Sequence, residues 1–280
     1  MSDVDMAWDG VLFDPDIGPG VHARLNIKPL LALGGTCKAA PGAITEQFAR
    51  LAWAALATAG YGKLCRYAAA IGNLRLLKWA RARGCLWNGD GIEAVIENSR
   101  IYETMLETAA SKGHLHLLKY AHENGCPSEL CASTCSEAAF AGHLDCLQYL
   151  HEQGFPWDEE TCRFAATRGH LDCLKYAHEH GCAWNTRTCE AAADEGDLDS
   201  LQYAHKNGCP WDTRTCEAAA GLYGGGSLAC LQYARENGCP WDKQACRAAA
   251  ATPDPERFWH HPGQLSAQEL REIVKWIDRQ

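Results

Sequence analysis

The stretch that decides the fold is TCRFAATRGHLDCLKYAHEHGCAW, residues 161–184. It recurs with small changes along the chain, and the leucine after its Gly-His pair marks the register of each copy. These leucines are Leu74, Leu115, Leu144, Leu171, Leu198 and Leu228. The shortest spacing is 27 residues, and the longer ones contain extra residues near 88–105, 130–131 and 221–227. Insertions confined to turns are typical of stacked repeats, so we predict an array of 27-residue units.

Each unit is predicted to contain two short helices. In the quoted copy the first helix carries Cys162, Ala165 and Ala166 on one face, and such small side chains let a neighbouring helix approach closely. A two-residue turn follows. We interpret its second residue as the N-cap of the second helix, because several copies have good capping residues there. This column reads Asn73, His114, His143, His170, Asp197 and Ser227.

The second helix is expected to turn Leu171, Leu174 and Tyr176 inward and to end at Gly181 as a C-cap. We therefore interpret the recurring tyrosines as a core stripe. A Cys-Pro-Trp-Asp stretch follows in two later copies, at 209–212 and 239–242. Proline prevents the helix from continuing there, and the tryptophan is expected to cover the boundary between units.

The chain is predicted to have three parts. Residues 1–58 form an N-terminal helical segment, residues 59–252 form the repeats, and residues 253–280 form a linker and a capping helix. The sequence Ser266-Ala-Gln-Glu269 is a capping-box signature, and an amphipathic run follows it. We expect residues 264–280 to seal the exposed end of the repeat core.

The repeats resemble the ankyrin family. The run from Ala165 to Leu171 is similar to the family's Ala-Ala-x-x-Gly-His helix turn, and Leu174 to Gly181 is similar to its Leu-Leu-x-x-Gly ending. The resemblance spans about residues 60–252 and implies an all-α solenoid of stacked antiparallel helix pairs, with the first helices on the concave surface. The unit is 27 rather than about 33 residues long, and Thr-Pro-Leu-His is absent. We expect the missing length to come from the β-hairpin finger.

The N-terminal segment resembles a divergent F-box, a three-helix motif. The opening Leu-Pro-x-Glu of that family is missing, whereas Leu33 and Trp53 fit its pattern together with the candidate docking residues Ile27, Leu30, Leu31, Cys37 and Lys38. The resemblance implies docking to the adaptor subunit of a cullin–RING ubiquitin ligase. The alternative is an irregular N-terminal cap of the solenoid.

Charge and composition exclude several classes of function. The net charge is −9, and residues 91–280 carry sixteen Lys/Arg against twenty-eight Asp/Glu. An acidic body repels phosphate backbones, so we do not expect a nucleic-acid partner. The sequence shows neither an export signal nor a run of about 18 apolar residues, so we expect no membrane insertion and a cytoplasmic or nuclear protein with reduced thiols.

The sixteen cysteines raise the question of metal binding or catalysis. The spacing His178-x3-Cys182-x6-Cys189 recurs one unit later, and Cys and His are the usual zinc ligands. However, Leu106 and Phe155 occupy cysteine columns in other copies. The columns therefore suit small buried hydrophobes, and no pair is distinguished as a catalytic dyad. We expect no cofactor, metal or catalytic residue; the least unfavourable metal site would be Cys126, Cys131 and Cys135.

Positions that vary between units while their neighbours do not are candidates for recognition. One such column directly follows the first-helix cysteine, and another lies four residues further on. They provide the candidate partner-binding residues Arg66, Phe140, Arg163, Thr167, Glu190, Asp194 and Glu217.

The sequence therefore predicts a non-enzymatic scaffold that binds a protein partner mainly through the first helices. Two more specific roles remain open: an F-box-type substrate adaptor of a ubiquitin ligase, or a structural subunit of a larger assembly. The competing class of protein is a thiol-rich metal or redox sensor.

Overall fold

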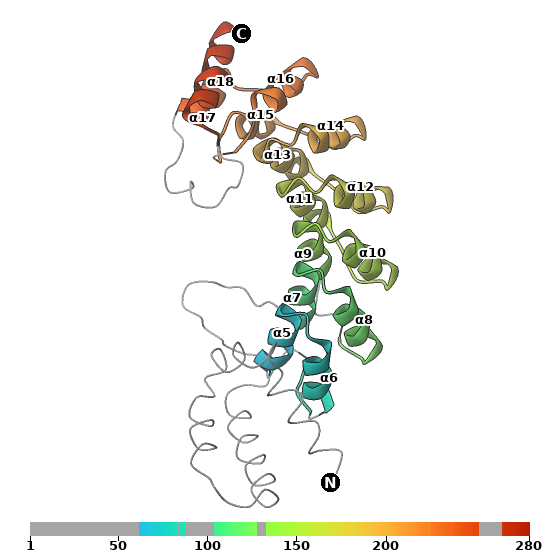
Figure 1. Cartoon of the computed structure of the whole chain (residues 1–280). Coiled ribbons are helices and arrows are strands. Elements are labelled where there is room, and N and C mark those ends of the chain that lie inside the picture. Colours follow the sequence, from blue (N-terminus) through green and yellow to red (C-terminus); the bar gives the residue numbers. More distant parts are fainter. Residues whose placement is uncertain (1–61, 83, 88–103, 128–132, 224, 252–264) are drawn as a thin grey trace, which may run out of the picture. The chain divides into compact units, whose positions relative to one another are not determined.

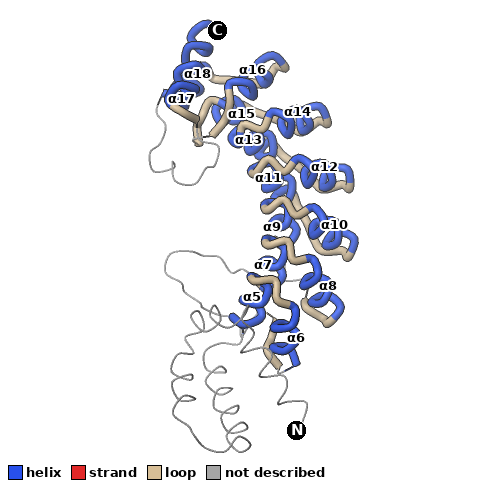
Figure 2. The backbone as a smooth tube through the Cα atoms, in the orientation of Figure 1, coloured by secondary structure: helices blue, strands red, loops and turns tan. Residues whose placement is uncertain are grey.

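The computed structural model describes residues 62–82, 84–87, 104–127, 133–223, 225–251 and 265–280. Within these ranges every regular element is an α-helix (Figures 1 and 2), which confirms the all-α prediction. The F-box-like candidates lie outside the described residues: Ile27, Leu30, Leu31, Cys37 and Lys38. The chain divides into two compact units, residues 1–105 and 106–280.

The described part of the first unit is one helix pair, α5 (Gly62–Ala70) and α6 (Leu74–Ala82), which pack against each other. Small and aliphatic side chains close the contact: Cys65, Ala68, Ala69, Leu76, Leu77 and Ala80 are all buried. After α6, the guanidinium of Arg81 lies 4.0 Å from the centre of the Trp87 ring. This pair is one repeat, with its tryptophan folded back on its own second helix.

In the second unit the first helices form one row and the second helices form another (Figure 2). The first helices are α7 (Met105–Ser111), α9 (Thr134–Phe140), α11 (Glu159–Thr167), α13 (Thr186–Glu195), α15 (Thr213–Ala219) and α17 (Lys243–Ala251). The second helices are α8 (Leu115–Glu123), α10 (Leu144–Glu152), α12 (Leu171–Glu179), α14 (Leu198–Lys206) and α16 (Leu228–Glu236). The chain ends with α18 (Ala267–Arg279).

The core lies between the two rows. Each first helix contributes the predicted small residues, and Cys162, Ala165 and Ala166 are fully buried. Successive first helices α9, α11, α13 and α15 make the most extensive helix contacts of the unit. Cysteine and alanine permit this because neither keeps a neighbouring backbone at a distance.

Local hydrogen bonds fix both ends of each helix pair. Asp158, Asn185 and Asp212 stand directly after the tryptophan, and each side chain accepts a hydrogen bond from the backbone N–H two residues on. At the other end Gly181 has φ +84°, and the N–H of Cys182 donates to the carbonyl of Ala177 at 2.9 Å. Glycine adopts this left-handed conformation without a steric penalty, so the predicted C-cap is confirmed.

The N-cap column behaves in two ways. Asn73, Asp197 and Ser227 cap the second helix through their side chains, as predicted. His114, His143 and His170 occupy the N-cap position but make no side-chain capping bond, so capping was the wrong role for the histidines. Two of these imidazoles fill space against the preceding repeat instead. A Cβ added at Gly113 or Gly142 would lie 2.6 Å from the ring of His143 or His170, respectively.

The tyrosine column also differs from its prediction. Leu174 is fully buried, whereas Leu171 and Tyr176 are only half-buried, so the tyrosines are not core residues. They belong to an aromatic ladder across the units. His178 stacks on Trp184 with ring centres 3.7 Å apart, and Trp184 meets Tyr203 of the next unit edge-on at 6.3 Å. The tryptophans thus cover the boundary between units, as expected.

The C-terminal helix closes the last repeat. Ser266 and Glu269 form the predicted capping box at the start of α18. The helix packs on α17 and also touches α16, with Leu270, Ile273 and Ile277 buried. Trp276 meets Trp241 at 6.3 Å, which extends the aromatic ladder into α18.

Candidate functional site

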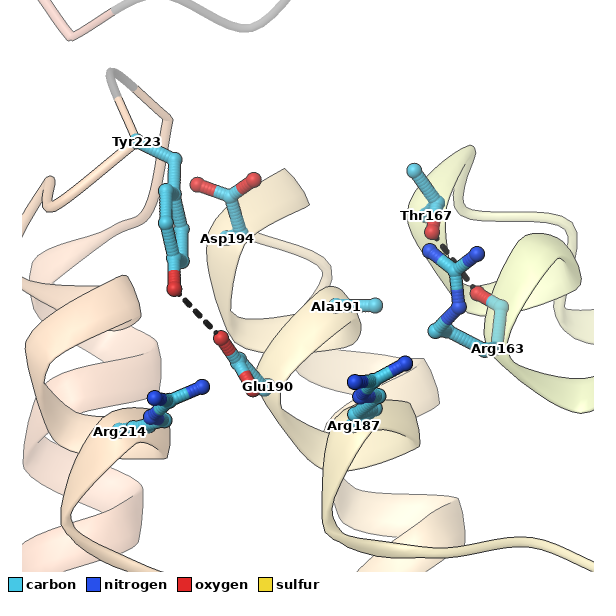
Figure 3. A pocket seen from close by; sticks show the side chains of 8 residues that line it. All are labelled: Arg163, Thr167, Arg187, Glu190, Ala191, Asp194, Arg214 and Tyr223. Carbon is cyan, nitrogen blue, oxygen red and sulfur yellow. Dashed lines mark hydrogen bonds between the residues drawn. The ribbon is translucent and has the colours of Figure 1, made fainter. Parts of the chain in front are cut away.

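An open groove of about 370 Å³ lies across the first helices α11, α13 and α15 (Figure 3). Half of the residues that line it are candidate partner-binding residues, predicted because their positions vary between units. The lining residues are Arg163, Thr167, Arg187, Glu190, Ala191, Asp194, Arg214 and Tyr223. Four of the seven sequence candidates therefore meet at one place, namely Arg163, Thr167, Glu190 and Asp194.

The repeat itself brings these side chains together. Arg187 and Arg214 occupy the second position of α13 and α15, directly above the Asn and Asp N-caps. Arg163 and Glu190 both follow the first-helix cysteine of their unit, so they also occupy equivalent positions. Tyr223 has no equivalent in other units, because it belongs to the three-residue insertion between α15 and α16.

Arg163 is held by its own helix. Its Nε donates to Glu160 Oε2 at 2.8 Å, its Nη2 bonds to the same oxygen, and the guanidinium lies 4.1 Å from the centre of the Phe164 ring. Thr167 Oγ1 donates to the Arg163 carbonyl at 2.8 Å. The hydrogen bond from Arg163, with Arg187 also nearby, lowers the pKa of Glu160, so that carboxylate remains charged.

The acidic side of the groove is tied to the insertion. Tyr223 Oη donates to Glu190 Oε1 at 2.6 Å (Figure 3). Burial and this bond to Glu190 raise the pKa of Tyr223 to about 12, so the phenol stays protonated and continues to donate. Asp194 is only 9% exposed, and its carbonyl accepts a hydrogen bond from the N–H of Gly226. The insertion therefore forms a wall at one end of the groove.

The remaining sequence candidates lie elsewhere. Phe140 on α9 meets Phe164 edge-on at 5.5 Å and supports the guanidinium of Arg168 at 4.6 Å. Glu217 on α15 is half-buried beside the groove; burial, followed by the charge of Asp242, raises its pKa. Arg66 lies on α5, in the first unit.

Sequence reasoning missed Arg187, Ala191, Arg214 and Tyr223. The two arginines had a detectable signal, because the position two residues before the first-helix cysteine also varies: Glu160, Arg187, Arg214 and Gln244. The sequence candidates come from the column directly after the cysteine and from the column four residues further on. Tyr223 had no such signal, since a residue in an insertion cannot be compared with other units.

Burial makes several of the described thiols unsuited to nucleophilic chemistry, whereas the hydrogen bond with Cys162 lowers the pKa of Cys182. All fourteen described cysteines are buried and form no disulfide. Burial, together with nearby carboxylates, raises the pKa of Cys146 and of Cys173 to about 12. Thiolate is the reactive form, and it is scarce at neutral pH with such a pKa. The described residues contain no group of three or more His, Cys, Asp or Glu side chains placed to hold a metal ion.

Known proteins share both the sequence pattern and the architecture of these repeats. Residues 135–178 match the family model described as "Ankyrin repeats (many copies)". This segment is therefore similar to ankyrin repeats. The fold is similar to that of the ankyrin repeat domain of human ASB11, with 17% sequence identity and a TM-score of 0.51, over 75% of this chain and 96% of that one. No curated protein matches the sequence significantly.

Ankyrin repeats are protein–protein interaction modules, which is the general class of function that the sequence predicted. Among the described helices, none is long and apolar enough to cross a membrane.

Proposed function

We propose that the chain is a non-enzymatic scaffold that holds a protein partner against the first helices α11, α13 and α15. The groove supports this proposal because it gathers side chains that differ from unit to unit, while the cysteines and alanines behind them are nearly constant. Constant residues build the stack, and varying exposed residues are free to serve recognition.

A binding experiment with matched surface variants tests the proposal. Partners captured by the full chain are identified by mass spectrometry, purified and titrated against the chain. A charge-reversal variant of the groove, R187E/R214E, is expected to weaken binding, whereas K112E/K206E, which alters two exposed lysines away from the groove, is expected to bind as the unaltered chain does. Loss of binding in the lysine variant alone would place the interface elsewhere.

The more specific role of ubiquitin-ligase adaptor depends on the F-box-like residues 27–38. We expect a purified cullin–RING adaptor subunit to bind the full chain and to lose binding when residues 1–58 are deleted. The groove variant R187E/R214E serves as a control, because it should leave adaptor binding unchanged. If the adaptor does not bind the full chain, a structural subunit of a larger assembly becomes the preferred role.

A further inference from the structure

We propose that the groove binds an extended acidic peptide segment, whose carboxylates pair with Arg187 and Arg214. This inference rests on the proposed function and specifies the chemistry of the partner. It follows from which charges in the groove are engaged within the molecule and which remain exposed.

The acidic side chains of the groove have internal roles. Glu190 accepts the hydrogen bond from Tyr223, and Asp194 lies largely buried beneath the insertion that contains Gly226. The third arginine is engaged as well, since Arg163 bonds to Glu160 and stacks on Phe164. A partner that presented a basic group here would have to displace these contacts.

Arg187 and Arg214, by contrast, face solvent. The side chain of Arg187 is 64% exposed, and its one recorded ion pair within the described residues is a long contact of 3.8 Å with Glu160. Arg214 is also exposed, and no hydrogen bond or ion pair of its guanidinium is recorded within the described residues. An arginine fork binds carboxylates well because it can donate two parallel hydrogen bonds.

The positions of these two positive charges are unfavourable with respect to the helix dipoles. Arg187 and Arg214 lie in the first turn of α13 and α15, where a helix favours acidic groups, and neither helix has an acid in that turn. Helix α11 follows the favourable rule, with Glu159 and Glu160 in its first turn. A positive charge in the first turn interacts unfavourably with the helix dipole, so Arg187 and Arg214 do not stabilise α13 and α15 in this way. Their side chains can therefore serve the binding of a partner.

The repeat also fixes the spacing of the two arginines. They occupy the same position on neighbouring packed helices, whose axes are separated by roughly 8–10 Å. In a β-extended peptide, side chains two residues apart lie on the same face at about 7 Å, and in an extended polyproline II segment side chains three apart do so at about 9 Å. The partner segment should therefore carry Asp or Glu residues two or three positions apart.

A peptide fits the surroundings better than a polyanion does. Glu217 lies beside the groove, and Asp212 caps the helix that carries Arg214. A nucleic acid would lay its regularly spaced phosphates over these acids as well as over the arginines. A peptide can confine its negative charge to the two positions where the arginines lie.

The test is a selection of random peptides, displayed on phage, against the immobilised full chain. Enriched peptides are expected to carry two acidic residues separated by one or two others. When these peptides are synthesised and titrated, we expect R187Q and R214Q each to weaken binding about tenfold, and added salt to weaken it further. K112E/K206E is the charge-matched control for R187E/R214E, and circular dichroism shows whether each variant is folded.

A second selection against R187E/R214E sharpens the result. Reversal of the preference, from acidic to basic peptides, supports the proposal directly. Enrichment of peptides that bind R187E/R214E and the unaltered chain equally overturns the inference; if substitution of Glu217 on α15 abolishes that binding, the proposed function still stands. Tighter binding of a single-stranded oligonucleotide or a phosphopeptide than of any acidic peptide overturns the choice of a carboxylate partner. A library without binders overturns the acidic-peptide inference, whereas the proposed function is decided by the titration of purified partners against R187E/R214E.

Discussion

The turn cysteines are more specialised than small hydrophobic residues. Cys182, Cys209 and Cys239 each lie after the second helix of their unit, and each thiol donates to the carbonyl of the residue that caps the first helix. The S–O distances are 3.0 Å to Asp158, 3.3 Å to Asn185 and 3.2 Å to Asp212. The thiol thus joins the end of a unit to its beginning. Where Phe155 replaces the cysteine, the side chain can fill the space but cannot donate.

Stability should depend on the buried thiols of the first helices at high pH. Burial is the main cause that raises the pKa of Cys65, Cys135 and Cys246 to about 12 from an ordinary value of 9.0. An acid with a raised pKa in the folded state contributes stability below its unfolded pKa and loses it as pH rises through the folded value. We therefore expect the free energy of unfolding to fall as pH rises above about 9.

Urea denaturation at a series of pH values measures this dependence. Native-state alkylation at neutral pH provides an independent measurement, because protected thiols should react only after unfolding. Mass spectrometry then assigns each modified cysteine. Rapid alkylation of Cys65, Cys135 or Cys246 in the folded chain would contradict the assigned burial.

At the scale of elements, the units are joined by the aromatic ladder. His205 stacks on Trp211 at 3.8 Å, and its Nδ1 lies 2.9 Å from the hydroxyl of Tyr233 in the next unit. One unit further on, Arg235 replaces the histidine and lies 4.4 Å from the centre of the Trp241 ring. The ladder therefore accepts either a neutral ring or a permanent cation over the indole.

H205R and H205A should separate these two possibilities. We expect the free energy of unfolding of H205R to lie within about 0.5 kcal/mol of that of the unaltered chain. For H205A we expect it to fall by about 1 kcal/mol, because the stacking on Trp211 is lost. Burial, then Lys206, lowers the pKa of His205, so its contribution is present above 6.5 and is lost as pH falls. The stability of H205R should therefore decline less between pH 7 and pH 5.5, as thermal unfolding followed by circular dichroism would show.

Two glycines provide a matched test of packing between units. Gly142 and Gly154 both have positive φ, +75° and +77°, but only Gly142 faces the His170 ring, whereas the space beside Gly154 is open. We expect G154A to cost about 1 kcal/mol through backbone strain alone, and G142A to cost about 2–3 kcal/mol. In the double variant G142A/H170A the excess should disappear, and additive losses would show that the ring is not responsible.

The repeat made most elements predictable from the sequence. A column read in six copies separates structural residues from variable ones, so the helix pairs, the glycine caps and the capping box at Ser266 were all found. The histidine and tyrosine columns were misread because their contacts cross from one unit to the next, and a single copy of the pattern does not contain such contacts. The groove was half predicted, because Arg187 and Arg214 lie in a column outside the two that provided the candidates, and its wall depends on Tyr223 in an insertion that occurs once.

At the scale of the whole molecule, the second unit is a one-dimensional stack with an end that must be covered. Each repeat packs on its neighbours, so the stability of the stack is close to a sum of repeat and interface contributions. Helix α18 covers the last repeat with its buried Leu270, Ile273 and Ile277. Without α18, the apolar face of α17 would be exposed to water.

Deletion of residues 266–280 should therefore destabilise the stack from its C-terminal end. Each lost aliphatic contact is worth about 1.5–3 kcal/mol, so we expect hydrogen exchange to become faster in α15, α16 and α17. Helices α9 to α12 should keep their protection, because α18 packs on α17 and α16. S266A is the control: it breaks the capping box but keeps the apolar contacts, and should cost about 1 kcal/mol. If protection fell equally in α9 and α17, the unit would unfold as one cooperative body and the nearest-neighbour description would fail.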